Sequence, residues 1–318
     1  MTTQSIAFLF PGQGSQSVGM LSKLAAESPI IRSTFDEASK ALGYDLWALC
    51  SEGPIESLNE TERTQPAMLA AGIAAWRAWL GQGAPKPALL AGHSLGEYSA
   101  LVAAGSIDFA AAVALVRFRG EAMQRAVAAG TGAMAAILGL DDAAIEAACA
   151  EAAQGAVVQP VNYNSPGQLV IAGEAEAVAR AIELCKARGA KRALLLPVSV
   201  PSHSALMQPA AEALRDRLQG LDIREPGTRV YAFDGATYAD AASIRDGLYR
   251  QLFNPVRWSA IVAAMIGEGA TTLIECGPGK VLSGLARRAP GGRDLALHAI
   301  ESPESLTAAL AAAGNACR

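Results

Sequence analysis

The sequence predicts an α/β protein with a mainly parallel sheet, into which a smaller α+β unit is inserted. Short apolar runs alternate with Ala-rich helical stretches along most of the 318 residues, which is typical of strands connected by helices. Residues 132–197 change this rhythm, because two strands follow one another between two helices. We therefore expect a large domain made of residues 1–127 and 198–318, and a small domain made of residues 128–197.

The composition is that of a folded globular protein, since 51% of the residues are hydrophobic and 18% are charged. A net charge of −4 without a basic run argues against a nucleic acid or an anionic membrane surface as partner. No apolar stretch approaches the ~20 residues of a membrane span, and the N-terminus lacks a signal peptide's cationic region. The five cysteines are scattered without metal-ligand spacing, so we expect a cytoplasmic protein without a metal.

The first strand is expected at residues 6–10, and a Gly-rich turn follows it at residues 11–16. This turn lacks the Gly-Lys-Ser/Thr ending of a phosphate loop, and Ser17 stands where the third Gly of G-x-G-x-x-G belongs. Nucleotide binding is therefore not expected. An exposed N–H group at the carboxyl end of this strand could instead help to hold an oxyanion.

A second strand, at residues 88–92, runs into Gly92-His93-Ser94-Leu95-Gly96, and a helix follows over residues 97–104. In a G-x-S-x-G turn between a strand and a helix, the serine is exposed on a sharp bend above the sheet. The start of the helix also leaves N–H groups free where an oxyanion would develop. We therefore predict that Ser94 is a nucleophile in an α/β-hydrolase-like large domain, the alternative being a Gly-Ser turn without chemistry.

The other elements follow from apolar periodicity and from Gly and Pro breaks. Further elements of the large domain are helices over 21–42, 61–80 (with Pro66 in the first turn), 109–128, 205–218, 244–253 and 260–268, strands at 230–233 and 272–276, and a last core helix after 277–280. The small domain is expected to have strands at 132–140, 156–162, 168–172 and 192–197 and helices at 141–153 and 174–189. This β-α-β-β-α-β order predicts a ferredoxin-like fold.

A serine nucleophile needs a base, and the chain has only three histidines. His93 follows a strand end, so its side chain should point away from that of Ser94. His298 lies in a strand-like run and is expected to be structural. His203, in a Pro-Ser loop at a helix start, is the predicted base, the alternative being an exposed loop histidine. No acidic residue stands out as its partner among Asp234, Asp240 and Asp246. A backbone carbonyl could therefore orient the histidine.

Arg119 lies on an apolar helix that begins soon after the helix behind Ser94. A guanidinium makes two parallel hydrogen bonds to a carboxylate, so this arginine could bind an acidic substrate group. Periodicity does not separate Arg119 from Arg117, and an ordinary solvated helix face remains the alternative.

Eight motifs follow one another along the chain: FPGQGSQ at 10–16, TQPA at 64–67, GHSLGEY at 92–98, RFRG at 117–120, NYNSPGQ at 162–168, PSHSALM at 201–207, QLFNPVRW at 251–258 and ECGPGK at 275–280. In this order they resemble the malonyl-CoA:acyl carrier protein transacylases over essentially the whole chain. The resemblance implies a ping-pong transfer of malonyl from malonyl-CoA to the phosphopantetheine thiol of holo acyl carrier protein, for fatty acid synthesis. One departure is Ala232-Phe233-Asp234, where the family usually has Asn-Val-Asp.

The resemblance also assigns roles to residues. Ser94 would carry the malonyl ester, His203 would act as general base and then general acid, and the main-chain carbonyl of Gln251 would orient it. Arg119 would pair with the malonyl carboxylate. The backbone N–H groups of Gln13 and Leu95 would form the oxyanion hole. The side chains of Gln65 and Asn162 would line the site. No cofactor is implied beyond the coenzyme A thioester substrate and the carrier's phosphopantetheine, and we expect a monomer.

Three other readings stay open. A free-standing malonyl acyltransferase of a polyketide pathway would carry the same motifs. An α/β-hydrolase-type esterase or thioesterase shares G-x-S-x-G but expects the order Ser, acid, His, with a late histidine. A non-catalytic module that docks a carrier protein would retain the fold with an inactive site. The presence of Ser94, His203 and Arg119 together argues against this reading.

Overall fold

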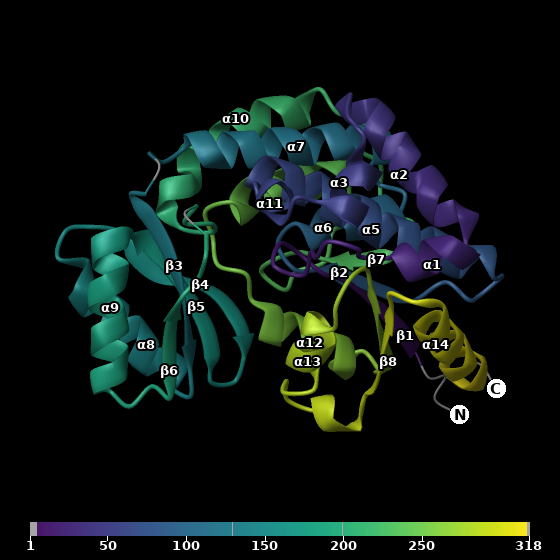
Figure 1. The fold of residues 1–318 in the computed structure, drawn as a ribbon. Coiled ribbons are helices and arrows are strands. Elements are labelled where there is room, and N and C mark those ends of the chain that lie inside the picture. Colours follow the sequence, from purple (N-terminus) through teal and green to yellow (C-terminus); the bar gives the residue numbers. More distant parts are fainter. Residues whose placement is uncertain (1–4, 129, 199, 317–318) are drawn as a thin grey trace.

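The computed structural model describes residues 5–128, 130–198 and 200–316, which form two sheets with helices around them (Figure 1). The larger sheet has the order β7-β2-β1-β8-β9, and all of its neighbouring strands are parallel. Its strands are β1 (Ser5–Phe10), β2 (Leu89–Gly92), β7 (Arg229–Tyr231), β8 (Ala270–Cys276) and β9 (Ala296–Ile300). β1 is central because its apolar run is buried on both faces, as a strand between two parallel neighbours requires. The predicted mixed α/β fold with a parallel sheet is confirmed.

The helices of this part cover both faces of the parallel sheet. They are α1 (Ser22–Glu27), α2 (Pro29–Leu42), α3 (Leu46–Glu52), α4 (Ile55–Leu58), α5 (Thr61–Gly81), α6 (Gly96–Ala103), α7 (Phe109–Arg125), α10 (Gln208–Gln219), α11 (Ala241–Gln251), α12 (Trp258–Gly267), α13 (Val281–Ala286) and α14 (Pro303–Ala316). In Figure 1, α5 and α6 lie above the sheet, α12 and α13 lie to the left of β8, and α14 lies to the right of β1 and β8. Among the described residues, none of the helices has the length and apolarity needed to cross a lipid bilayer.

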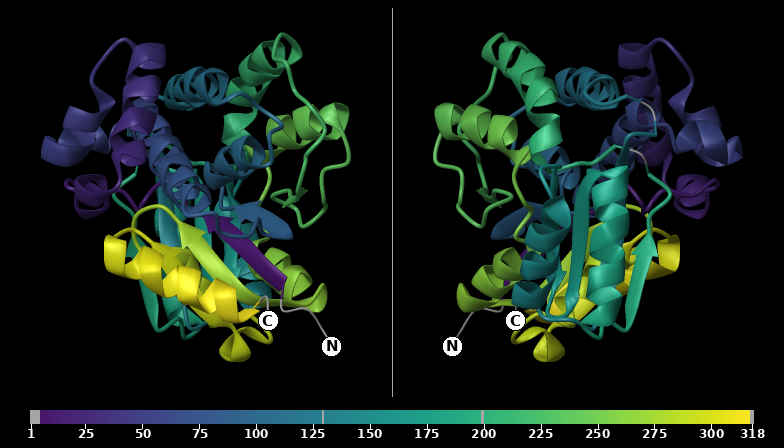
Figure 2. Two further views of the ribbon diagram at one scale, coloured as in Figure 1. Left: turned by 90° about the vertical axis from the view of Figure 1, so that its right-hand side faces the viewer. Right: turned by 90° about the vertical axis from the view of Figure 1, so that its left-hand side faces the viewer.

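The smaller sheet is antiparallel and has the order β4-β5-β3-β6. Along the chain its unit consists of β3 (Gly132–Leu138), α8 (Asp142–Ala153), β4 (Val158–Ser165), β5 (Gln168–Glu174), α9 (Ala175–Ala187) and β6 (Arg192–Leu195). Helices α8 and α9 pack side by side on one face (Figures 1 and 2). The opposite face carries Met134, Val161 and Val170. The β-α-β-β-α-β order is present as expected, while the ferredoxin-like and hydrolase-like assignments and the domain limits stay predictions.

Strand β4 connects the two parts of the molecule. Its Tyr163 N–H donates to the Val256 carbonyl (2.9 Å), and the Val256 N–H donates to the Val161 carbonyl (2.8 Å). Beside this bridge, His93 Nε2 lies 2.9 Å from Asn164 Oδ1. The smaller sheet is therefore held against the turn that carries Ser94.

Two expectations about helices are wrong. Pro66 lies inside α5, beyond its first turn, because the helix already begins at Thr61, where the Glu60 carbonyl accepts the Arg63 and Thr64 N–H groups. The helix after 277–280 is also not the last core helix, since α14 follows and buries an apolar face. In addition, the helical stretch 21–42 is divided into α1 and α2 at Ser28, immediately before Pro29.

Candidate active site

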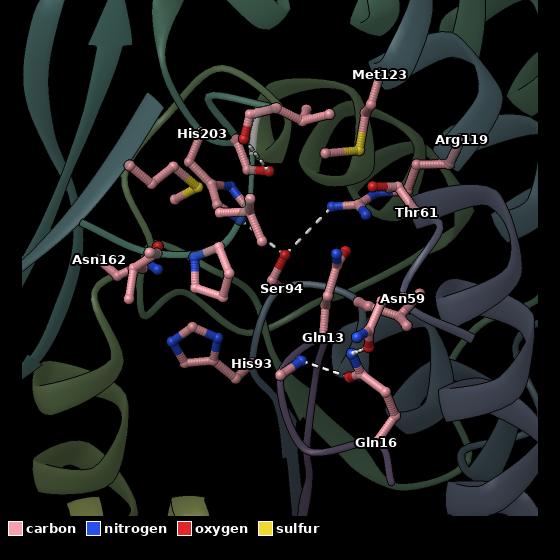
Figure 3. A pocket seen from close by; sticks show the side chains of 18 of the residues that line it. Gln13, Gln16, Asn59, Thr61, His93, Ser94, Arg119, Met123, Asn162 and His203 are labelled. Atoms are coloured by element: carbon pink, nitrogen blue, oxygen red, sulfur yellow. Dashed lines mark hydrogen bonds between the residues drawn. The ribbon is translucent and has the colours of Figure 1, made fainter. Parts of the chain in front are cut away.

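Ser94 occupies a strained turn between β2 and α6, where its φ of 52° lies in the left-handed region that side chains rarely adopt. Both glycines of the motif are required by close contacts. A Cβ on Gly92 would lie 1.9 Å from the carbonyl carbon of Gly96, and a Cβ on Gly96 would lie 1.9 Å from the Phe10 carbonyl oxygen. The turn is therefore packed directly on the end of β1, and Ser94 projects into the cavity (Figure 3).

His203 lies 109 residues further along the chain, and its Nε2 is 2.7 Å from Ser94 Oγ. Its Nδ1 is 2.7 Å from the main-chain carbonyl oxygen of Gln251. Because a carbonyl only accepts, Nδ1 carries the proton and Nε2 is free to accept the Ser94 hydroxyl. Burial, and next the positive charge of Arg119, lower the pKa of His203 to about 3. The imidazole is therefore neutral near pH 7, which is the form that a general base needs.

Arg119 approaches the same hydroxyl from α7, with Nη2 3.3 Å from Ser94 Oγ and 3.0 Å from Gln251 Oε1. Its side chain is only 1% exposed, and burial lowers its pKa. Within the described residues, no carboxylate lies within ion-pair distance of this guanidinium, and its Nε has no hydrogen-bond partner. Arg117 instead turns outward and pairs with Glu121 at 3.0 Å. The buried cation is thus suited to an anionic group that enters the cavity.

Two backbone N–H groups flank Ser94. In the part of the chain that the structure describes, neither the Gln13 nor the Leu95 N–H donates a hydrogen bond to protein, and both residues line the cavity. Gly12 brings the two loops together, since a Cβ there would lie 2.5 Å from the His93 carbonyl oxygen. This arrangement can hold the oxyanion of a tetrahedral intermediate.

The cavity around Ser94 has a volume of about 500 Å³ and lies between the two parts of the molecule. Asn162 and Met134 line it from the smaller sheet, and the buried side-chain oxygen of Asn162 has no hydrogen-bond partner among the described residues. Figure 3 shows Ser94 between His203 and Arg119, with Asn162 on the side of the cavity opposite Arg119. Gln65 is not among the lining residues, because it lies behind Met123, with Nε2 3.4 Å from the Met123 sulfur.

The alternative partners of the serine lie elsewhere. Besides its contact with Asn164, His93 packs on Trp258 with ring centroids 5.4 Å apart, and its ring points away from the Ser94 hydroxyl (Figure 3). His298 lies on β9, half-buried. Asp234 and Asp246 pair with Arg250, and Asp240 caps α11. None of these aspartates contacts His203, whose Nδ1 contacts the Gln251 carbonyl.

The sequence did not indicate a role for Glu97 and Tyr238, which lie behind the site. Glu97 is fully buried one turn after Ser94 and accepts hydrogen bonds from the Tyr238 hydroxyl and from Gln251 Nε2, the latter at 2.8 Å. Burial raises the pKa of Glu97 to about 7. The motif showed a glutamate directly after G-x-S-x-G, but nothing in the sequence indicated that it would face inward toward Gln251.

No group of three or more His, Cys, Asp or Glu side chains in the described ranges is placed to hold a metal ion. Cys50, Cys149, Cys185 and Cys276 are buried free thiols, and Cys317 lies outside the described residues.

The chain is similar to known acyltransferases along nearly its whole length. The family model described as "Acyl transferase domain" matches residues 7–289. The malonyl CoA-acyl carrier protein transacylase of Salmonella typhimurium is 58% identical over 305 residues, covering 96% of this chain and 98% of the relative. The crystal structure of an acyl carrier protein S-malonyltransferase from Vibrio cholerae is 56% identical, with a TM-score of 0.93 and coverage of 96% and 99%. A malonyl-transacylase solved with its type II PKS acyl-carrier protein is 54% identical, with a TM-score of 0.95 and coverage of 97% and 100%.

Proposed function

Since this chain belongs to the acyl transferase domain family, among the malonyl CoA-acyl carrier protein transacylases, we propose that it transfers malonyl through an ester on Ser94. The chain is an acyltransferase that moves malonyl from malonyl-CoA to the phosphopantetheine thiol of holo acyl carrier protein. One observation carries the assignment of the site. The Ser94 hydroxyl lies within 2.7 Å of a neutral histidine and 3.3 Å of a buried arginine, in one cavity.

In the first half-reaction, Ser94 Oγ attacks the thioester carbonyl carbon and gives its proton to His203 Nε2. The carbonyl oxygen becomes an oxyanion that accepts hydrogen bonds from the Gln13 and Leu95 N–H groups. The carbon–sulfur bond then breaks, the coenzyme A sulfur takes the proton from His203, and malonyl stays on Ser94 as an ester. Gln251 keeps the imidazole oriented through its main-chain carbonyl.

In the second half-reaction, the carrier's thiol gives its proton to His203 and attacks the ester carbon. The bond to Ser94 Oγ breaks, and the serine recovers the proton. Because water could attack the same ester, the cavity must place the thiol and exclude or misplace water. Asn162 lines this space, and Gln65 supports it from behind Met123.

Arg119 selects the acyl group. Its guanidinium makes charge-assisted hydrogen bonds to the free carboxylate of malonyl, which an acetyl group lacks. The enzyme needs no resident cofactor, because coenzyme A enters as substrate and the phosphopantetheine arrives on the partner. A monomeric state and a cytoplasmic location are part of this proposal.

We assign the transfer to fatty acid synthesis. A polyketide pathway is the second candidate, because one similar malonyl-transacylase was solved with a type II PKS acyl-carrier protein. The two candidates share the reaction and differ in the carrier. Comparing kcat/KM for a fatty acid carrier and a polyketide carrier distinguishes them, and a higher value for the polyketide carrier would overturn the assignment.

The central experiment mixes the purified protein with malonyl-CoA, without a carrier, and records intact and peptide mass spectra. A malonyl adduct on Ser94 that is removed by holo carrier protein or by pantetheine is the expected result, and Ser94→Ala should carry none. No adduct and no released coenzyme A would indicate a docking module. Released coenzyme A without a surviving adduct, in the absence of a thiol, would indicate a hydrolase.

A further inference from the structure

Glu97 is a buried carboxylate that the reaction described above does not use. It lies on the first turn of α6 with no exposed surface, and its two oxygens accept hydrogen bonds from the Tyr238 hydroxyl and from Gln251 Nε2. Both partners donate, so the ionised carboxylate is the form that satisfies them. A carboxylate held in this way orients the side chains that donate hydrogen bonds to it.

The amide of Gln251 is one of those donors, and its orientation is determined completely. Nε2 donates one hydrogen to Glu97 Oε2 (2.8 Å) and the other to the Ser94 carbonyl (2.9 Å). Neither the Ser94 carbonyl nor the ionised Glu97 carboxylate can donate, so the amide cannot turn over without losing both bonds. Its oxygen, Oε1, must therefore face the opposite way, where it accepts from Arg119 Nη2 at 3.0 Å.

This orientation matters for Arg119, whose guanidinium has no carboxylate partner within ion-pair distance in the described ranges. Gln251 Oε1 and Ser94 Oγ are the two acceptors of Nη2, and the Tyr98 ring lies 5.4 Å from the guanidinium carbon. If the amide of Gln251 turned over, its NH₂ group would face the guanidinium, and two donors would oppose each other. Glu97 thus prevents the rotamer of Gln251 that would push Arg119 away from Ser94.

We propose that Glu97, supported by Tyr238, is a positioning residue that acts through the side-chain amide of Gln251 to hold Arg119 beside Ser94, and so maintains the preference for acyl groups with a carboxylate. The inference rests on the proposed malonyl transfer. It predicts an effect on selectivity and not on the base, because Gln251 orients His203 through its main-chain carbonyl at the end of α11, separately from its side chain.

The test compares Glu97→Met, which has a similar length but no oxygen acceptor, with Glu97→Gln. Transfer to holo carrier protein is measured as kcat/KM with malonyl-CoA and with acetyl-CoA. Glu97→Met should lower the malonyl value about tenfold, the usual effect of losing a hydrogen bond to a charged group, and leave the acetyl value unchanged. Glu97→Gln should retain the malonyl preference, since its amide oxygen can accept from Gln251 while its NH₂ turns to Tyr238.

A double-mutant cycle with Arg119→Ala separates this role from a merely structural one. In the Arg119→Ala background, Glu97→Met should change the malonyl-to-acetyl ratio no further, because its effect passes through Arg119. Additive changes in the ratio, or an equal loss for both donors in Glu97→Met, would overturn the proposal. If the wild-type protein transferred neither donor, the proposed function would fail instead, and this result is distinct.

Tyr238→Phe decides the question if Glu97→Met does not fold. It removes only the hydroxyl that donates to Glu97, and it should lower the malonyl value alone, by about threefold. An unchanged ratio in this variant would contradict the proposal. Glu275→Gln is the matched control, since Glu275 is another buried carboxylate, on β8, bonded to the Leu282 and Ser283 N–H groups. Its malonyl-to-acetyl ratio should equal that of the wild type.

Discussion

The parallel and antiparallel sheets face the same cavity but contribute to it differently. The parallel sheet presents backbone at the ends of β1 and β2, packed so closely that a single Cβ on Gly96 would overlap the Phe10 carbonyl. The antiparallel sheet presents side chains, such as Met134 and Asn162, and no described residue makes a hydrogen bond to the side-chain oxygen of Asn162. From this comparison we expect that bond making depends on a rigid backbone frame, and that the opposite wall mainly shapes the space. Substitutions on the two sides should therefore have effects that differ in magnitude and in their dependence on the acyl group.

The largest effect is expected on the rigid side, for His203→Ala. Removal of the base should lower the rate of Ser94 acylation by ~10²–10⁴, to a similar extent for malonyl-CoA and acetyl-CoA. Stopped-flow measurement of coenzyme A release gives this rate. His298→Ala, on the distant strand β9, is the control and should leave the rate unchanged. A loss confined to malonyl-CoA would show that His203 contributes to recognition of the acyl group and is not the base.

Arg119→Ala should lower kcat/KM for malonyl-CoA by about 10²-fold, because charge-assisted hydrogen bonds to the carboxylate are lost. The value for acetyl-CoA should stay the same or rise. Arg117→Ala is a matched control on the same helix, since Arg117 pairs with Glu121 on the surface. Equal losses for both donors in Arg119→Ala would remove the selective role of Arg119.

Gly96→Ala measures the rigidity itself. The added Cβ must displace backbone at the end of β1, and we expect the free energy of unfolding to fall by about 3 kcal/mol in urea titrations. Gly284→Ala is the control, because a Cβ on Gly284 in α13 meets nothing within 4 Å. That variant should be as stable as the wild type or up to about 1 kcal/mol more stable. Similar losses in both variants would contradict a closely packed frame.

A smaller effect is expected on the opposite wall. Asn162→Ala removes one neutral polar group, whose oxygen has no hydrogen-bond partner in the described part of the chain, so kcat/KM for malonyl-CoA should fall only about threefold. Steady-state transfer to holo carrier protein measures it. A loss as large as that of His203→Ala would place Asn162 in the bond-making machinery and end the distinction between the two sides.

The smallest change concerns pH. The base must be neutral to accept a proton, and a His203 pKa near 3 keeps it neutral down to pH 5. The rate of Ser94 acylation by acetyl-CoA should therefore stay constant between pH 7 and pH 5. The uncharged donor is chosen because it lacks a free carboxylate, so its rate does not depend on binding at Arg119. A decrease centred near pH 6.5 would indicate a histidine with an ordinary pKa.

The sequence predicted the parts of the fold that depend on local pattern. The buried strand 6–10, the Ser94 turn and the β-α-β-β-α-β order are all visible as runs of residues, and the structure contains them. The family resemblance is likewise confirmed by the identities and the structural matches. Helix α14 could also have been predicted, because Ser302 is followed by Pro303 at its start. The Ser302 hydroxyl caps the helix by accepting the Ser305 N–H, and Pro303 is its first residue.

Contacts between segments that are far apart in the chain could not be predicted from the sequence. Arg117 and Arg119 are two residues apart, and only the packing of α7 decides that one is buried and the other exposed. Gln251 meets Glu97 across 154 residues, and no local pattern encodes the direction of an amide. Pro66 was misplaced although the start of this helix at residue 61 was predicted, because Pro66 is its sixth residue and lies beyond the first turn.

The pairing of the strands has a consequence for the order of assembly during folding. In the antiparallel sheet every pair of strands lies within residues 132–195, whereas β1 pairs with β8 across the distance from Ser5 to Ala270. Closing so long a loop requires more conformational entropy to be lost before contacts compensate it. We therefore expect the antiparallel unit to form early and the central strand to close late. The Ser94 turn rests on the end of that strand, so the Ser94 hydroxyl becomes correctly placed only when nearly the whole chain has folded.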